Sequence, residues 1–579
     1  MKKLLFIIIA TAALFVSGCE DFLDTRNLYQ KDLTNFYKTP TDINEAMGGV
    51  YNALYVGGVH SEEHLAANLL SDYMLGGGGP DDITAKNVDK FLDPTEDTYS
   101  DLWKQTYNGV YRTNAIIEAV TDADYSSYFN TAEEATAFKN TALGEAYFMR
   151  GFFMYRAARF FGGMPIIPRT DSPRDVPRAT FTETFGQIAA DFMMAAETMP
   201  AINPMTVSLS NYGHANRWVA KAYLARTFLF YTGYMTNIEK TATTELALPG
   251  EGGTLTKAEV VTELDDVIAN SHYELTPDFR NLWPYSYANT SAGTEVLPWA
   301  KTENLAWVGQ DGPNSTIGTG NKEVMFALRY AFGNWGWTEG QKFNNRIPLF
   351  FGIRGNSMIP FAEGWGWGPI HPVFFNAWPN DDLRKIASVL EMGKAEQGTG
   401  SYAPNKGDHE TGLFNKKYSH LQHNDPDPAL PDNGKKGMFF YIYKWNNGDP
   451  MQLETAQDFF YLRYADVLLM HSELTETATG INEVRARVDL LPVAYSLENL
   501  KKERLYELAF EGLRWFDLVR WGDVENAANN YFSTPTNVMN SGVAGVYTVT
   551  YPVVTKGLLP IPESEIRLSN GVYVQNPGW

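Results

Sequence analysis

The feature that most constrains the fold is a stretch near the end of the chain, from Glu503 to Gly522. Its apolar positions recur at steps of three and four residues, which places them on one face of a helix: Leu505, Leu508, Gly512, Phe516 and Val519. Side chains of opposite charge lie three residues apart between them, and Gly522 is expected to end the helix. Such a helix needs a groove that buries its apolar face and partners that satisfy its arginines. We therefore interpret its charges as structural.

Residues 38–240 are predicted to form a helical half. Helical periodicity or caps mark 41–54, 61–75, 97–120, 133–161, 180–199 and 216–234. We expect Thr41 or Asp42 to cap the first helix, and Thr180 with Glu183 to form a capping box. Residues 76–82 are glycine-rich and read as a loop, since no strand precedes them to make a phosphate loop.

Small residues alternate with aromatic ones between Gly144 and Pro165, so neighbouring helices can approach closely there. Paired helices with small residues at their crossings are typical of tetratricopeptide-type stacks, although no clean repeat is present. The predicted fold is mainly α, with a tetratricopeptide-like helical-pair scaffold, an irregular loop-rich subdomain and a few short strands.

Residues 241–455 have a different composition. After a helix at 257–270 and a short strand within 323–330, tryptophans stand beside glycine, proline or small residues, which is typical of loops. Aromatic rings can pack on the apolar face of a sugar while polar side chains bind its hydroxyls. The candidate ligand-binding residues are Trp335, Trp337, Trp365, Trp367, Trp378, Asn334, Asn345, Arg346 and Glu363. The alternative is that these aromatics pack on the helical half as satellite clusters.

The closing segment, residues 456–579, should complete the scaffold. Residues 458–473 are apolar almost all round, so a buried helix is expected, and a satisfied core network explains its charges better than catalysis: Arg463, Asp466, His471 and Glu473. Helices are also expected at 481–490 and 496–521. The chain end is expected to pack back on the scaffold.

The first residues read as a secretion signal. Lys2 and Lys3 precede an apolar run from Leu4 to Val16, which is too short to span a bilayer. Val-Ser-Gly-Cys follows and looks like a bacterial lipobox, which predicts removal of residues 1–18 and lipid attachment to Cys19. Several acyl chains on one residue would hold the protein firmly to a membrane. Residues 19–37 would form the lipidated N-terminus and a polar tether.

Charge and motifs argue against several functions. The net charge of −21 argues against nucleic acid as a partner and against docking on anionic lipid. A single cysteine allows neither an intramolecular disulfide nor a cysteine-based zinc site. His420 and His423 lack a third ligand at a defined spacing and read as a solvated loop. Enzyme motifs are missing, although two carboxylates would suffice for a glycosidase. We expect no catalytic residue, metal or cofactor.

Several separated blocks resemble the SusD/RagB-like outer-membrane lipoproteins of Bacteroidetes. They are Gly144–Pro165, Asp382-Leu-Arg-Lys385, Arg463–Leu469, Glu507–Gly522, Leu558–Ile566 and Gln575–Trp579. The resemblance implies a non-catalytic cell-surface glycan-binding lipoprotein on a helical scaffold with ligand sites on variable loops. It also implies an outer-membrane, lipid-anchored location facing the cell exterior, and delivery of oligosaccharide to a SusC-like TonB-dependent transporter. Glu20 and Asp21 fit export to the outer face.

Two alternatives remain open. A RagB-like member would bind peptides for a peptide-importing transporter, and its site would need donors and acceptors for a peptide backbone. A structural or adhesive surface lipoprotein would have no transporter.

Overall fold

The computed structural model describes residues 36–55, 63–93, 97–173, 175–209, 211–289, 302–314, 318–331, 344–355, 358–359, 361, 363–394, 399–400, 402–419, 421, 455–527, 529 and 533–579. The predicted signal peptide, Cys19 and most of the tether lie outside these described residues. So do His420, His423 and three candidate ligand residues, Asn334, Trp335 and Trp337.

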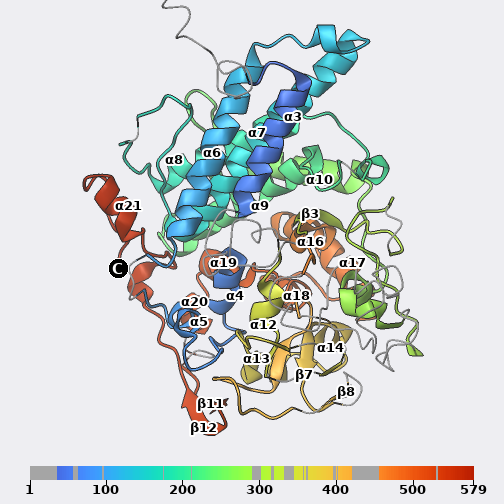
Figure 1. Cartoon of the computed structure of the whole chain (residues 1–579), viewed down its shortest axis with the longest axis vertical. Coiled ribbons are helices and arrows are strands. Elements are labelled where there is room, and N and C mark those ends of the chain that lie inside the picture. Colours follow the sequence, from blue (N-terminus) through green and yellow to red (C-terminus); the bar gives the residue numbers. More distant parts are fainter. Residues whose placement is uncertain are drawn as a thin grey trace, which may run out of the picture.

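Long helices that each pack against the next build the N-terminal half (Figure 1). They are α6 (Ser100–Thr121), α7 (Ala132–Phe161), α8 (Phe181–Thr198), α9 (Arg217–Asn237) and α10 (Lys257–Asn270), and α3 (Pro40–Asn52) packs against α6 and α7. This arrangement confirms the predicted mainly α, helical-pair scaffold. The predicted ranges for α6 to α10 are right to within a few residues.

Capping boxes set where several helices begin. Thr180 and Glu183 cap α8 as predicted, and the same arrangement occurs at α7 and α10. The predicted cap of α3 is wrong, because Thr39 is the N-cap and Pro40 takes the first helical position. The predicted helix at 61–75 is also shorter than expected. Its described part is α4 (Glu63–Leu69), after which the chain turns and bridges to the segment around Ile370.

The predicted buried helix at 458–473 is wrong at its beginning. Phe459–Arg463 is a strand, β10, and α16 (Tyr464–Thr475) follows directly. The strand forms because its β-favouring side chains pair antiparallel with β3 (Val324–Leu328), with Phe459 opposite Leu328. Three further helices follow: α17 (Thr479–Ala486), α18 (Leu497–Glu507) and α19 (Arg514–Trp521).

The stretch from Glu503 to Gly522 is two helices rather than one. Helix α18 ends at Glu507, and α19 begins only at Arg514. Phe510 and Gly512 have φ values of 66° and 72° between them, which no right-handed helix accommodates. Gly522, with φ 70°, ends α19 as predicted.

The remaining described chain carries short helices and strands between loops. The helices are α5 (Ile83–Asp89), α12 (Ile347–Phe351), α13 (Pro372–Ala377), α14 (Leu383–Ser388), α20 (Val524–Ala527) and α21 (Glu563–Leu568). The strands are β1 (Glu245–Ala247), β2 (Thr254–Thr256), β4 (Ile353–Arg354), β5 (Met358–Ile359), β6 (Glu363–Gly364), β7 (Val389–Glu391), β8 (Thr399–Gly400), β9 (Leu413–Asn415), β11 (Thr536–Asn540) and β12 (Val543–Tyr547). All described strands pair in twos, β4 with β6 in parallel and the others antiparallel.

The chain end packs on the scaffold, as predicted. The backbone N–H of Leu559 donates to the carbonyl of Phe160 at 2.8 Å, and Asn576 Nδ2 donates to the carbonyl of Phe161 at 3.0 Å. These bonds fix the closing segment against the end of α7. Among the described helices, none has both the length and the apolar character that a bilayer span requires.

Candidate functional site

The charged residues of the C-terminal segment form a buried network. Arg463 Nη1 donates to Glu323 Oε1 at 2.5 Å and to Glu507 Oε1 at 2.9 Å, and its Nε donates to Glu511 Oε2 at 2.8 Å. All four side chains are buried. The Glu507 carboxylate is buried, which opposes its charge, but the surrounding arginines outweigh burial and lower its pKa. The network therefore stabilises the fold, as predicted for Arg463.

Asp466 and Glu473 of α16 are also held by arginines, whereas His471 does not belong to this buried network. Asp466 accepts hydrogen bonds from Arg226 and Arg504, and Glu473 accepts from Arg520 at 2.5 Å. His471 lies nearer the surface, where its Nε2 is 2.8 Å from Asp265 Oδ1. Each has a protein partner.

The Asp382-Leu-Arg-Lys385 block belongs to the same core. Asp382 caps α14, and the fully buried Arg384 binds Asp382, Glu503 and Glu507. This block thereby connects the loop-rich region to α18.

Two of the candidate ligand tryptophans are buried. Trp367 stacks on Phe350 with ring centroids 4.7 Å apart, and Trp378 stacks on Tyr506 at 4.8 Å. Both are 1% exposed. The expectation of exposed rings is wrong for these two, because each ring packs into the main hydrophobic core. They pack against α12 and α18, not on the helical half as satellite clusters, which was the alternative interpretation.

The other described candidates lie in different settings. Asn345 is buried and fixes the start of α12, since it donates to the carbonyl of Gln457 at 2.6 Å and accepts from Ile347 N. Arg346 and Trp365 are partly buried, and Glu363 is exposed. Binding of ligand by these surface residues stays a prediction.

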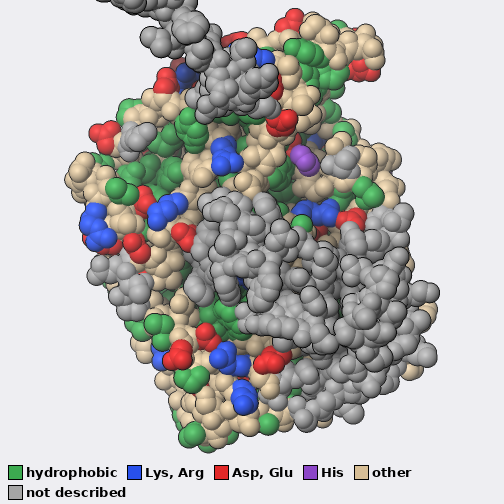
Figure 2. All heavy atoms as spheres, in the orientation of Figure 1, with side chains coloured by type: hydrophobic (Ala, Val, Ile, Leu, Met, Phe, Trp, Pro, Cys, Tyr) green, Lys and Arg blue, Asp and Glu red, His purple; other side chains and the backbone are tan. Residues whose placement is uncertain are grey.

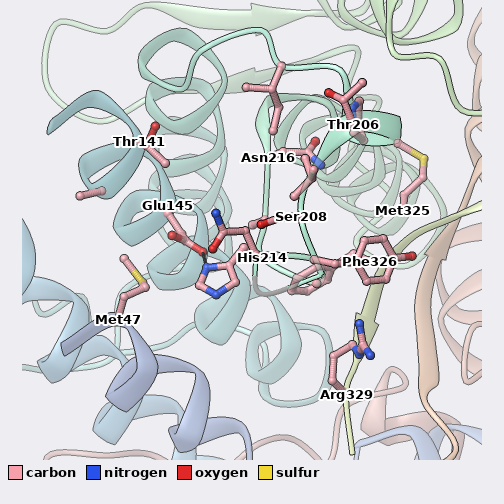
Figure 3. A pocket seen from close by; sticks show the side chains of 18 of the residues that line it. Met47, Thr141, Glu145, Thr206, Ser208, His214, Asn216, Met325, Phe326 and Arg329 are labelled. Atoms are coloured by element: carbon pink, nitrogen blue, oxygen red, sulfur yellow. Dashed lines mark hydrogen bonds and ion pairs between the residues drawn. The ribbon is translucent and has the colours of Figure 1, made fainter. Parts of the chain in front are cut away.

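A cavity of about 750 Å³ lies elsewhere, between the helical half and β3 (Figure 3). Its walls come from α3, α7, β3 and the segment 202–216, and it lies within the size range of ligand pockets. Of the predicted ligand residues that the structure describes, none lines it. Its lining residues are Ile43, Asn44, Met47, Gly48, Ala137, Phe138, Thr141, Ala142, Glu145, Ile202, Asn203, Pro204, Thr206, Val207, Ser208, Asn211, Tyr212, Gly213, His214, Ala215, Asn216, Tyr273, Val324, Met325, Phe326, Ala327 and Arg329.

Helical spacing explains how one wall forms. Phe138, Thr141 and Glu145 recur at steps of three and four along α7, so they share a face. Opposite them, the segment 202–216 is held at its ends by Asn203 and Asn216, whose side chains cap a short 3₁₀ turn and α9. Figure 3 shows Glu145 and His214 pointing toward each other, with Thr206 and Phe326 across the cavity.

Glu145 is the centre of a hydrogen-bonded group in the wall. Its Oε1 accepts from Tyr51 Oη at 2.6 Å and lies 2.6 Å from His214 Nδ1. Tyr51 Oη also accepts from the backbone N–H of Ala215 at 2.8 Å. Burial opposes the charged form of His214, but the charge and hydrogen bond of Glu145 outweigh it and raise the pKa of His214. Glu145 thus faces the cavity as a carboxylate held in place.

Arg329 lies at the other end of the cavity and is neutralised by two acids. Its Nε is 3.0 Å from Asp458 Oδ2, and its Nη2 binds Asp311. The guanidinium also lies over the Tyr212 ring, 5.1 Å from the centroid. Burial raises the pKa of Asp458 to about 7, even though Arg329 opposes the shift.

The lining combines apolar walls with uncharged hydrogen-bonding groups, which suits a neutral polar ligand. Among the described lining residues, Glu145 is the one carboxylate, whereas glycoside hydrolysis uses a pair. No described group of His, Cys, Asp and Glu is arranged to hold a metal. Sequence reasoning missed this cavity because its residues are far apart in the chain. The signal available was an acid within the aromatic block after Gly144.

Comparison with known proteins defines the class. The family model described as "SusD family" matches residues 371–579, and the one described as "Starch-binding associating with outer membrane" matches residues 21–229. The "SusD-like protein P2" of Formosa agariphila is 24% identical over all of this chain and 99% of its own length. These matches place the chain in a class of proteins that associate with the outer membrane. The chain belongs to the SusD family.

Solved structures share the fold over most of the chain. A "Laminarin binding SusD-like protein" aligns with a TM-score of 0.68 at 21% identity, over 94% of this chain and 100% of that one. "Surface glycan-binding protein A from Bacteroides thetaiotaomicron in complex with laminarihexaose" aligns with a TM-score of 0.63 at 18% identity, over 93% and 99%.

Proposed function

We propose that this chain is a non-catalytic, cell-surface glycan-binding lipoprotein that delivers oligosaccharide to a SusC-like TonB-dependent transporter. Its site is the cavity between α3, α7 and β3. The observation that carries this proposal is the cavity itself, whose apolar walls and uncharged polar groups match the apolar faces and hydroxyls of a sugar. The names of similar proteins support the ligand class, since two of them bind laminarin or laminarihexaose.

The membrane and transporter parts of the proposal have different support. The words "associating with outer membrane" describe one matching family model, and the lipobox-like sequence at Cys19 provides an anchor. Delivery to a transporter is the part of the proposal that rests on the family resemblance alone. Co-purification in detergent with a large barrel protein tests it, and isolation of the chain alone would count against it.

Trp365 and Glu363 remain candidates for a second contact with a long glycan. Glu363 begins β6 and is exposed, and Trp365 follows this strand, is partly buried and packs on Trp367 with ring centroids 6.0 Å apart.

Gly48 offers a test of the cavity. It is exposed on α3, it lines the cavity, and a Cβ added there meets nothing within 4 Å. Gly48→Trp should therefore obstruct the cavity without disturbing the core. In affinity electrophoresis against laminarin, starch, xylan and galactomannan, at least one polymer should retard the wild type. That polymer should bind Gly48→Trp about tenfold more weakly or worse.

Gly48→Ala is the matched control and should be retarded like the wild type. Retardation by none of the polymers, with binding of peptides instead, would overturn the proposed function. Equal retardation of the Trp and Ala variants would show that the ligand does not bind in the cavity.

A further inference from the structure

We infer that Glu145 makes the cavity select neutral glycans against anionic ones such as sulfated or uronate polymers. This inference rests on the proposed function and deepens it, because it names the substrate class and the residue that sets it.

The first step is the state of the Glu145 carboxylate. The residue is 6% exposed, and its Oε1 already accepts from Tyr51 and lies against His214. Its Oε2 accepts no hydrogen bond from the described residues and is not among the fully buried atoms. A carboxylate oxygen that is open and lacks a donor accepts hydrogen bonds from whatever enters the cavity.

The second step is the chemistry that can satisfy this oxygen. Sugar hydroxyls donate hydrogen bonds, and a hydrogen bond to a charged acceptor is stronger than one between neutral groups. A sulfate or carboxylate on the ligand has no donor to offer and brings a like charge next to the Glu145 carboxylate. Like charges placed together in this way strongly disfavour binding.

The third step is the balance of charge around the cavity. Of the described lining residues, three can be charged near neutral pH: Glu145, His214 and Arg329. His214 is committed to Glu145, and Arg329 is paired with Asp311 and Asp458. The described lining therefore offers an anionic ligand no cation that is free of an acidic partner. The net charge of −21 disfavours anionic polymers in the same direction.

Chemical sulfation of one polymer separates charge from shape. Laminarin, starch and galactomannan are each compared with their sulfated derivatives in affinity electrophoresis with wild type, Glu145→Gln and Glu133→Gln. The wild type should bind the best neutral polymer about tenfold or more tightly than its sulfated form. In Glu145→Gln this preference should shrink at least about threefold, because the amide keeps the shape and loses the charge.

Glu133→Gln is the matched control. It removes the same charge from the first turn of the same helix, at an exposed position about 18 Å along the axis from Glu145. The control should keep the full preference, and all three proteins should show the same unfolding transition. A preference that also shrinks in Glu133→Gln would assign the effect to overall charge and overturn the role of Glu145.

The failures are distinguishable. Equal or tighter binding of a sulfated polymer by the wild type, or an unchanged preference in Glu145→Gln, would overturn this inference alone. Absence of retardation by every neutral polymer would overturn the proposed function and this inference with it.

Discussion

Arg463 shows what a single residue does in this core. It is 1% exposed and binds three carboxylates on three different elements or loops, so its guanidinium joins β10 to α18 and to the turn after it. A charge buried in this way is stable only while its partners are present. The role of Arg463 is therefore to hold β10 against α18 and against the residue that precedes β3.

Arg463→Met should lower the free energy of unfolding by about 3–5 kcal/mol, because it leaves buried carboxylates with fewer partners. Denaturant unfolding at pH 7 measures this loss. Arg169→Met is the control, since Arg169 pairs with Asp171 on an exposed loop, and it should be indistinguishable from the wild type. A loss no larger in Arg463→Met than in the control would contradict the structural role.

Glu410 is a buried carboxyl group that, unlike Glu507 beside Arg463, has its pKa raised. It is 2% exposed, and burial raises its pKa from an ordinary 4.5 to about 7, although a backbone hydrogen bond from Gly407 opposes the shift. Between these two values the folded state holds a proton that the unfolded chain has lost. The contribution of Glu410 to stability therefore falls as pH rises through this window.

Glu410→Gln should copy the protonated form at every pH. We expect it to raise the free energy of unfolding by about 1–3 kcal/mol at pH 8 and to change it little at pH 4.5. Other buried acids, such as Asp89, titrate in both proteins and cancel in the difference. A difference between variant and wild type that is the same at both pH values would contradict this account.

At the scale of elements, close approach of α9 and α19 joins the N-terminal half to the C-terminal signature. A Cβ added to Gly233 would lie 2.7 Å from the backbone carbonyl oxygen of Arg520, which cannot move independently of its helix. Asn237 on the same helix donates to that carbonyl at 2.8 Å. The absence of a side chain at Gly233 therefore sets the spacing of these two helices.

Gly233→Ala should force the helices apart and destabilise the protein by about 1–3 kcal/mol. Gly48→Ala makes the same change in α3 where there is open space, and it should instead stabilise by about 0.5–1 kcal/mol through helix propensity. Thermal unfolding should show a lower midpoint for Gly233→Ala and a higher midpoint for Gly48→Ala than for the wild type. Equal effects of the two substitutions would contradict the close approach.

The same scale shows what the sequence could predict. A helix such as α8 was predictable because it carries a capping box and a long periodic face. The interruptions of the predicted helices could not be predicted. Positive φ at Phe510 and the pairing of β10 with β3 depend on contacts with distant parts of the chain. Burial of Trp367 and Trp378 could not be predicted either, because a loop composition does not show which rings find a partner. The predicted domain boundaries stay a prediction.

At the scale of the whole molecule, the cavity and the exposed candidate residues lie on different parts of the surface. The face in Figure 2 shows acidic and basic side chains interspersed over the described helical part, with no large field of one sign. The cavity lies between that helical half and β3, whereas Trp365 and Glu363 lie on the loop-rich half. Recognition by the cavity should therefore depend on shape and hydrogen bonding more than on long-range attraction.

The most direct test of the account is a crystal structure of the chain with an oligosaccharide of the neutral polymer that retards it most. The account predicts sugar density between α3, α7 and β3, with a hydroxyl within hydrogen-bond distance of Glu145 Oε2. Density confined to the surface around Trp365, with the cavity holding only water, would contradict it.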